Sequence, residues 1–400
     1  MHSLFAQPFF TRYFFARQLS VLAYSIEAVA VGWQIYAIAH AALALGLVGL
    51  LLFLPQVALA VPAGVLADRF DRRKIVFLCS FGEALGVIVF ACLAWQQSHA
   101  FWAYGAALLV SGAARATSAP AERALLVGIV DESAFQRASA LTSSVAQMLT
   151  ILGPAAAGAL IALSTPLAFL VAAFAYLASA AAYASLRMRS QPHIDPGELD
   201  PIGGIRYLRK QPEVLGAISL DLFAVLFGGA TALLPIFATT ILHVGPLGFG
   251  LMRAAPGVGA AIVAGYLARR PLERGAGRAL FFCVAAFGIA TIAFGLSKNL
   301  ALSLVALLAI GGFDMVSVVI RMMLVQLRTP DPLRGRVSAI ENIFIGASNE
   351  LGAFESGLTA AWLGAEASVA LGGLATLAVI IAWAFAFPSL RRLDRLESAP

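Results

Sequence analysis

Charged side chains are scarce in this chain of 400 residues. They make up 12% of the sequence, whereas about a quarter of the residues of an ordinary soluble domain are charged. Hydrophobic residues make up 60%, and the mean hydropathy is +0.88. These proportions exclude a soluble globular protein. The chain instead has the composition of a protein that lies in a lipid bilayer.

The signatures of soluble enzymes and metalloproteins are also missing. There is no glycine-rich phosphate loop ending in Gly-Lys-Ser/Thr, so an ATP-driven pump would need a separate partner. The three cysteines lie in apolar segments at spacings that match no metal site, and the five histidines lie at segment ends or in loops. We therefore expect no metal, no cofactor, no nucleic-acid partner and no enzymatic activity.

Long apolar runs predict twelve membrane-spanning helices, since one span needs about 20 apolar residues. The expected spans are residues 10–38, 43–67, 75–96, 100–121, 136–163, 166–187, 213–242, 247–269, 279–297, 300–327, 337–364 and 367–388. This pattern predicts an all-α membrane protein. Its domains would be an N-terminal six-helix half (1–187), a linker with an amphipathic segment (188–212), and a C-terminal six-helix half (213–400).

The distribution of Lys and Arg predicts the orientation of these spans. If the N-terminus is cytoplasmic, most of the 27 cations fall in cytoplasmic loops, and Lys298 alone falls in an outer loop. Such an asymmetry follows the positive-inside rule. We therefore expect a multi-pass protein of the cell inner membrane with both termini in the cytoplasm.

A basic loop between the second and third spans carries the most specific motif. The stretch 64–74 reads Gly-Val-Leu-Ala-Asp-Arg-Phe-Asp-Arg-Arg-Lys. It resembles the signature loop between helices 2 and 3 of the major facilitator superfamily of secondary transporters. Weaker copies of two segments support parallel repeats of the kind found in that superfamily, because residues 63–69 align with 264–270 and residues 137–140 align with 336–339.

Segments in spans 10 and 11, and in the loop between them, narrow the resemblance to one branch of the superfamily. The stretches 314–321, 333–339 and 348–357 resemble the branch of the superfamily that includes the enterobactin exporter and macrolide efflux proteins. This resemblance implies two pseudo-symmetric six-helix halves, a monomer in the bilayer, and transport of a small molecule by alternating access. It also implies a charge cluster that closes the cytoplasmic side. The expected members of this cytoplasmic gate are Gly64, Asp68, Arg69, Arg72, Arg73, Glu122 and Asp131, with the last two expected on the loop after span 4.

Ionisable residues within the spans are the candidates for function, because each costs about 2.5–3.5 kcal/mol or more to insert. Glu27 and Asp314 are among the deepest, and we expect them to couple protons, although a purely structural buried pair remains the alternative. The resemblance implies that spans 1, 4, 7 and 10 line a central cavity. Candidate cavity residues are Arg115, Asp221, Arg321, Trp33, Tyr36, Phe223 and Phe227. Asp314 and Arg321 lie seven positions apart on one helix face, too far for direct contact, so each should face a charge on another helix.

Two acids and an amide in span 11 form a further candidate group. Asn349, Glu350 and Glu355 lie among small residues, a combination that serves either helix packing at a contact between halves or coupling.

Together these observations predict an exporter of a small amphipathic molecule, of drug or siderophore type, that exchanges its cargo for protons across the inner membrane and draws its energy from the proton gradient. An importer or facilitator of a polar metabolite is the alternative, and a cavity rich in amides and paired cations would favour it. A membrane-integral enzyme or receptor is a third class, against which the lack of a histidine within the spans argues.

Overall fold

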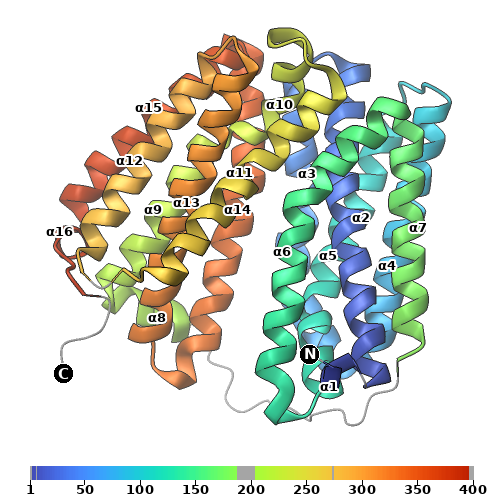
Figure 1. Cartoon of the computed structure of the whole chain (residues 1–400), viewed down its shortest axis with the longest axis horizontal. Coiled ribbons are helices and arrows are strands. Elements are labelled where there is room, and N and C mark those ends of the chain that lie inside the picture. The colour runs from blue at the N-terminus through green and yellow to red at the C-terminus, as the bar shows by residue number, and fades with distance from the viewer. Residues whose placement is uncertain (1, 6, 187–202, 273, 396–400) are drawn as a thin grey trace. The chain divides into compact units, whose positions relative to one another are not determined.

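The computed structural model describes residues 2–5, 7–186, 203–272 and 274–395. A helical segment coincides with each of the twelve predicted spans, so the all-helical fold is confirmed (Figure 1). In chain order these are α2 (Pro8–Ala39), α3 (Ala42–Arg69), α4 (Arg72–Trp95), α5 (Phe101–Ile129), α6 (Glu132–Leu163), α7 (Thr165–Ala184), α9 (Pro212–Gly228) with its continuation to Ile241, α11 (Gly245–Arg269), α12 (Ala276–Gly295), α13 (Leu300–Arg328), α14 (Asp331–Leu363) and α15 (Ala365–Ala386). Short helices α1 (His2–Phe5), α8 (Gly203–Lys210) and α16 (Pro388–Arg391) complete the described fold.

Ten segments are long and apolar enough to cross a membrane by composition alone. Helices α5 and α14 do not meet that standard, because each carries several charged residues within its length. Both are as long as their neighbours, at 29 and 33 residues. Their charges therefore mark them as the segments that need polar partners in the fold.

The seventh span is not one continuous helix. Helix α9 ends at Gly228, and a 3₁₀ turn (Ala230–Leu233), α10 (Leu234–Ile236) and a π-helical turn (Phe237–Ile241) follow. Two adjacent glycines at the break have no side chain to stiffen the backbone, and Pro235 has no N–H for the preceding turn. The span predicted over 213–242 thus coincides with the apolar segment Pro212–Ile241, and its helix is interrupted after Gly228.

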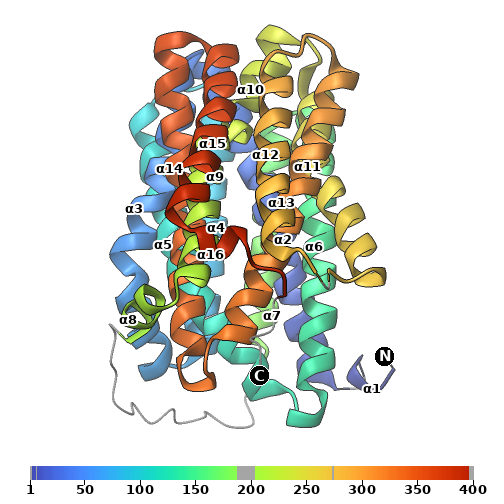
Figure 2. The same cartoon turned by 90° about the vertical axis from the view of Figure 1, so that its left-hand side faces the viewer.

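The described chain groups into two compact units. In the first unit, α4 packs on α5 and α7, and α2 packs on α6 and α7. Its largest fully buried side chains include Tyr13, Phe90, Tyr176 and Tyr183. In the second unit, α12 packs on α13 and α15, while α9 packs on α14 and α15, and Figure 2 shows α9, α12 and α15 side by side. Each unit is thus a helix bundle with its own core.

The units do not follow the two sequence halves at every point. Residues 41–49, the start of α3, group with the second unit, and residues 245–254, the start of α11, group with the first. Glycines allow the close approach: a Cβ at Gly357 would lie 2.6 Å from the Cα of Gly46, and one at Gly158 would lie 2.8 Å from the Cα of Gly250. Small residues permit such backbone contacts in membrane proteins.

The predicted linker falls mostly outside the described residues. Its last part contains the amphipathic segment, where the structure has helix α8, Gly203–Lys210. Leu208 of α8 is buried together with Val214, Ile218, Val325 and Val337. One face of this short helix therefore packs on α9, α13 and α14.

Candidate transport site

Glu27 lies near the middle of α2 and is buried in the first unit, with 4% of its surface exposed. Two hydroxyl groups donate to its carboxylate. Ser111 Oγ of α5 donates to Oε1 at 3.1 Å, and the Tyr176 hydroxyl of α7 donates to Oε2 at 2.9 Å. Three helices therefore meet at this carboxylate.

Arg115 is the middle residue of α5 and supplies the positive charge of this cluster. Its guanidinium carbon lies 3.2 Å from the centre of the Tyr24 ring, a cation–π arrangement. The same guanidinium interacts electrostatically with Glu27 and with Glu83, a buried acid in the middle of α4. Two carboxyl groups thus share one cation at mid-helix depth.

Arg321 organises the polar core of the second unit. It is 4% exposed and forms ion pairs with Asp221 of α9 and with Glu341 of α14, the latter with Nε 2.9 Å from Oε1. As expected from the sequence, its partners lie on other helices. A buried arginine that bridges two carboxylates fixes the three helices around it, since breaking such a pair leaves a buried charge without compensation.

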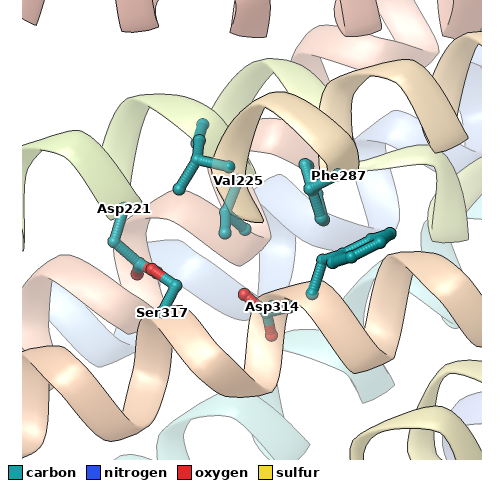
Figure 3. Close-up of a pocket in the computed structure, with 8 residues that line it drawn as sticks. Asp221, Val225, Phe287, Asp314 and Ser317 are labelled. Atoms are coloured by element: carbon teal, nitrogen blue, oxygen red, sulfur yellow. The ribbon is translucent and has the colours of Figure 1, made fainter. Parts of the chain in front are cut away.

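Asp314, the middle residue of α13, lines two pockets of the second unit. Figure 3 shows Asp221 on α9 and Ser317 and Asp314 on α13 around the smaller pocket. The larger cavity has a volume of about 200 Å³, and it is bounded by the side chains of Asp221, Asp314, Arg321 and Asn349 as well as apolar groups. Drug-sized ligands occupy about 300–1,000 Å³, so this cavity has room for part of such a molecule.

Arg115 and Asp314 occupy corresponding places in the two repeats. Helices α5 and α13 are both 29 residues long, and each residue is the middle one of its helix. The alignment of residues 137–140 with 336–339 has the same offset. The position that carries a cation, Arg115, in the first unit therefore carries an acid, Asp314, in the second.

Two aromatic candidates of the second unit belong to an aromatic cluster with Trp383. Phe223 packs against Trp383 of α15 with ring centroids 5.2 Å apart, and against Phe227 at 6.4 Å. Neither ring lines the pockets around Asp314 that the described residues form. The reason is helical periodicity: Asp221 and Val225 are four apart and face the cavity, which turns residues 223 and 227 toward α15. Their role in cargo binding stays a prediction.

The aromatic candidates of the first unit lie toward the end of α2. Trp33 stacks on Phe249 with ring centroids 5.6 Å apart, and Tyr36 packs beside His40 at 6.0 Å. Their role in cargo binding stays a prediction.

Most residues of the expected cytoplasmic gate are described. Arg73 pairs with Asp71 at 2.5 Å and donates to the Leu186 carbonyl, and the buried Arg72 donates to the Ala67 carbonyl. Asp71 also caps α4 by accepting from the Arg73 backbone N–H, and these contacts with Arg73 lower the pKa of Asp71.

Other gate candidates differ from the expectation or lie outside the description. Glu122 belongs to α5 rather than to a loop, and its carboxylate lies 2.5 Å from Arg17. Its expected loop position was therefore wrong, because α5 extends eight residues beyond the predicted span, to Ile129. Asp131 directly precedes α6, and Gly64 and Arg69 lie in α3. The side chain of Asp68 lies outside the described residues, so the gate stays a prediction.

The candidates of span 11, Asn349, Glu350 and Glu355, lie in different surroundings on α14. Asn349 lines the 200 Å³ cavity, and its amide donates to the Ile345 carbonyl at 2.8 Å. Glu350 lies where α14 approaches Gly49, since a Cβ there would be 2.7 Å from the Glu350 carbonyl oxygen. Glu355 is partly buried in the next turn of α14.

Sequence reasoning missed several members of the cluster in the first unit. Ser111, Tyr176 and Tyr24 are neutral polar residues within apolar segments, and nothing in the sequence distinguishes them from packing residues. Ser111 has one signal, because it lies four positions before Arg115 and thus on the same face of α5. Among the described residues, no group of three or more His, Cys, Asp or Glu side chains could hold a metal ion.

Comparison with known proteins identifies the family. The sequence model of the Major Facilitator Superfamily matches residues 13–353. The chain belongs to the major facilitator superfamily. It is similar to the enterobactin exporter EntS of Citrobacter koseri, with 24% identity over 98% of this chain and 95% of that protein. It is also similar to EntS of Shigella boydii, with 26% identity over 96% of this chain and 93% of that protein.

Solved structures of the superfamily share this fold. A point mutant of the nucleoside transporter NupG superposes with a TM-score of 0.75, at 11% identity over 96% of this chain and 99% of that chain. A bacterial homolog of the human lysosomal transporter Spinster has a TM-score of 0.72, at 13% identity over 95% of both chains. Like other members of the superfamily, this chain is a multi-pass membrane transporter of a small molecule and not an enzyme.

Proposed function

We propose that this major facilitator protein exports a small amphipathic molecule, of drug or siderophore type, in exchange for protons. The observation that carries the proposal is the presence, in each unit, of acidic side chains at mid-helix depth beside a single arginine: Glu27 and Glu83 beside Arg115, and Asp221 and Asp314 beside Arg321. Acids at this depth are costly and can gain or lose a proton as their surroundings change. The near full-length similarity to EntS supports export.

Alternating access supplies the mechanism. Glu27 and Asp314 are the coupling candidates, because each lies at mid-helix depth and Asp314 borders a cavity. A carboxyl group that binds a proton on one side of the membrane and releases it on the other couples cargo movement to the gradient. The charges that surround the coupling carboxyl groups come from Arg115, Asp221 and Arg321, and they influence when a proton binds and leaves. No cofactor is required, and both termini lie in the cytoplasm.

Transport of a polar metabolite without proton exchange is the second candidate. The cavity beside Asp314 is lined in part by Thr231, Ser348 and Asn349, which could hydrogen-bond a polar cargo. Its remaining lining includes Val225, Phe287 and other apolar residues, so an amphipathic cargo suits the cavity better.

The deciding experiment is proton flux in proteoliposomes with a pH dye inside, challenged with lipophilic cations, macrolides and catecholate siderophores. Cargo-triggered proton movement should occur with the wild type and be lost in Glu27→Gln and in Asp314→Asn. Glu366→Gln is the matched control, since the Glu366 side chain is 40% exposed and pairs with the exposed Lys298. Cargo movement without proton flux, unchanged in both variants, would overturn proton exchange and favour the facilitator.

A further inference from the structure

The acid cluster of the first unit contains two carboxyl groups that are not equivalent. Glu27 accepts hydrogen bonds from Ser111 and Tyr176, as described above. Glu83 is equally buried, with 5% of its surface exposed, and makes no hydrogen bond or ion pair to any residue that the structure describes. Both share Arg115 as their nearby cation. The two acids therefore have the same depth and the same cation but different hydrogen-bonding environments.

Hydrogen bonds donated to a carboxylate stabilise its ionised form, because the donors replace the water that burial removes. Glu27 has two such donors, so its ionised form is better stabilised by hydrogen bonds than that of Glu83. Glu83 has none among the described residues, so only the electrostatic attraction of Arg115 favours its ionised form.

The charge balance around Glu83 points the same way. The groups that interact electrostatically with it are Glu27 of α2, Arg115 and Glu122 of α5, Tyr176 and Tyr183 of α7, and Cys79 of its own helix. Glu122 is paired with Arg17 at 2.5 Å, so this pair is neutral. The remaining set has one cation and two acids. If both acids were ionised, a net negative charge would remain in a medium of low dielectric constant, which is unfavourable.

We propose that Glu83 is a proton-binding site: its carboxyl group carries a proton in the resting protein, while Glu27, which accepts hydrogen bonds from Ser111 and Tyr176, is ionised. When cargo binding or the conformational change admits water to this cluster, Glu83 releases its proton to that water, because hydration then stabilises a second carboxylate. The coupling role rests on the proposed function, whereas the resting proton on Glu83 does not.

Infrared spectroscopy of the purified protein without cargo tests the resting proton directly. A protonated carboxyl group has a C=O stretching band that a carboxylate lacks and that shifts in D₂O. Glu83→Gln should remove one such band from the wild-type spectrum. This loss alone does not locate the proton, because removing either acid leaves the other as the sole partner of Arg115 and favours its ionisation.

Tyr176→Phe decides between the two acids, since it deletes one donor to Glu27 and keeps the ring. If the proton is on Glu83, the band that Glu83→Gln removes stays at its wild-type frequency in Tyr176→Phe. A shifted band would place the proton on Glu27 and overturn the proposal, and so would a Glu83→Gln spectrum that has lost no band.

Two further readouts separate a proton-binding role from a merely structural one. Glutamine resembles a protonated glutamic acid, so Glu83→Gln should keep the wild-type unfolding temperature in detergent, whereas Glu27→Gln should lower it. In proteoliposomes, Glu83→Gln should retain cargo exchange across the membrane and lose cargo-triggered proton release. Unchanged proton release in Glu83→Gln would overturn the coupling role, and an absence of proton flux in the wild type as well would count against the proposed function instead.

Discussion

Replacement of Arg321 by glutamine should destabilise the protein strongly. Arg321 is the cation between Asp221 and Glu341, and the Arg321 and Asp221 side chains are only 5% and 9% exposed. Removing one partner of a buried pair costs about 3–5 kcal/mol, because the other charge is left buried without compensation. At about 2–4 °C per kcal/mol for a unit of this size, the unfolding temperature should fall by roughly 6–20 °C.

The assay is thermal unfolding of the purified protein in detergent, comparing Arg321→Gln, Asp221→Asn and the double variant. Asp221→Asn should cost less, since Arg321 keeps Glu341 as its partner at 2.9 Å. The double variant should be more stable than Arg321→Gln, because it no longer buries the carboxylate of Asp221. Such a cycle isolates the interaction of the two side chains.

A matched control uses the ion pair of Lys298 with Glu366, whose side chains are 64% and 40% exposed. Exposed pairs contribute about 0–1 kcal/mol, so Lys298→Gln should change the unfolding temperature little. If Arg321→Gln unfolds at the same temperature as Lys298→Gln, the structural role assigned to Arg321 is refuted.

Two further predictions concern the backbone and a helix cap. Gly311→Ala should cost about 1–3 kcal/mol of stability, because its Cβ would lie 1.8 Å from the Pro256 carbonyl oxygen. Gly82→Ala should be neutral or stabilising, because the space around its Cβ is open, and unfolding temperatures in detergent check both variants. Asp71→Ala should cost about 0.5–2 kcal/mol at neutral pH through loss of the cap of α4. Because its contacts with Arg73 lower the pKa of Asp71 in the folded state, the stability that Asp71 contributes is present above the ordinary pKa of aspartate and is lost as the pH falls through the lowered one. The difference between wild type and Asp71→Ala should therefore shrink in acid, and an equal difference at pH 7 and in acid would contradict this account.

The sequence by itself determined the membrane class, the family and the twelve helical segments. Each segment must satisfy its own backbone hydrogen bonds in lipid and be apolar along its length, and both properties are local. The charges of α5 and α14 were also visible in the sequence, as was the expectation that Arg321 has a partner on another helix. The break after Gly228 was missed, because membrane helices tolerate glycine and proline where neighbouring groups restore the hydrogen bonds.

Only the tertiary structure decided which side chains meet. Asp221 lies 100 positions before Arg321, and Tyr176 lies even farther from Glu27, so no local pattern could pair them. The rotation of α9 about its axis places Phe223 against Trp383 and Asp221 at the cavity, although the two residues are only two positions apart in the sequence. Hydropathy fixes how deep a residue lies in the membrane, but its partners depend on how each helix is rotated in the bundle, and that is set by packing against all its neighbours at once.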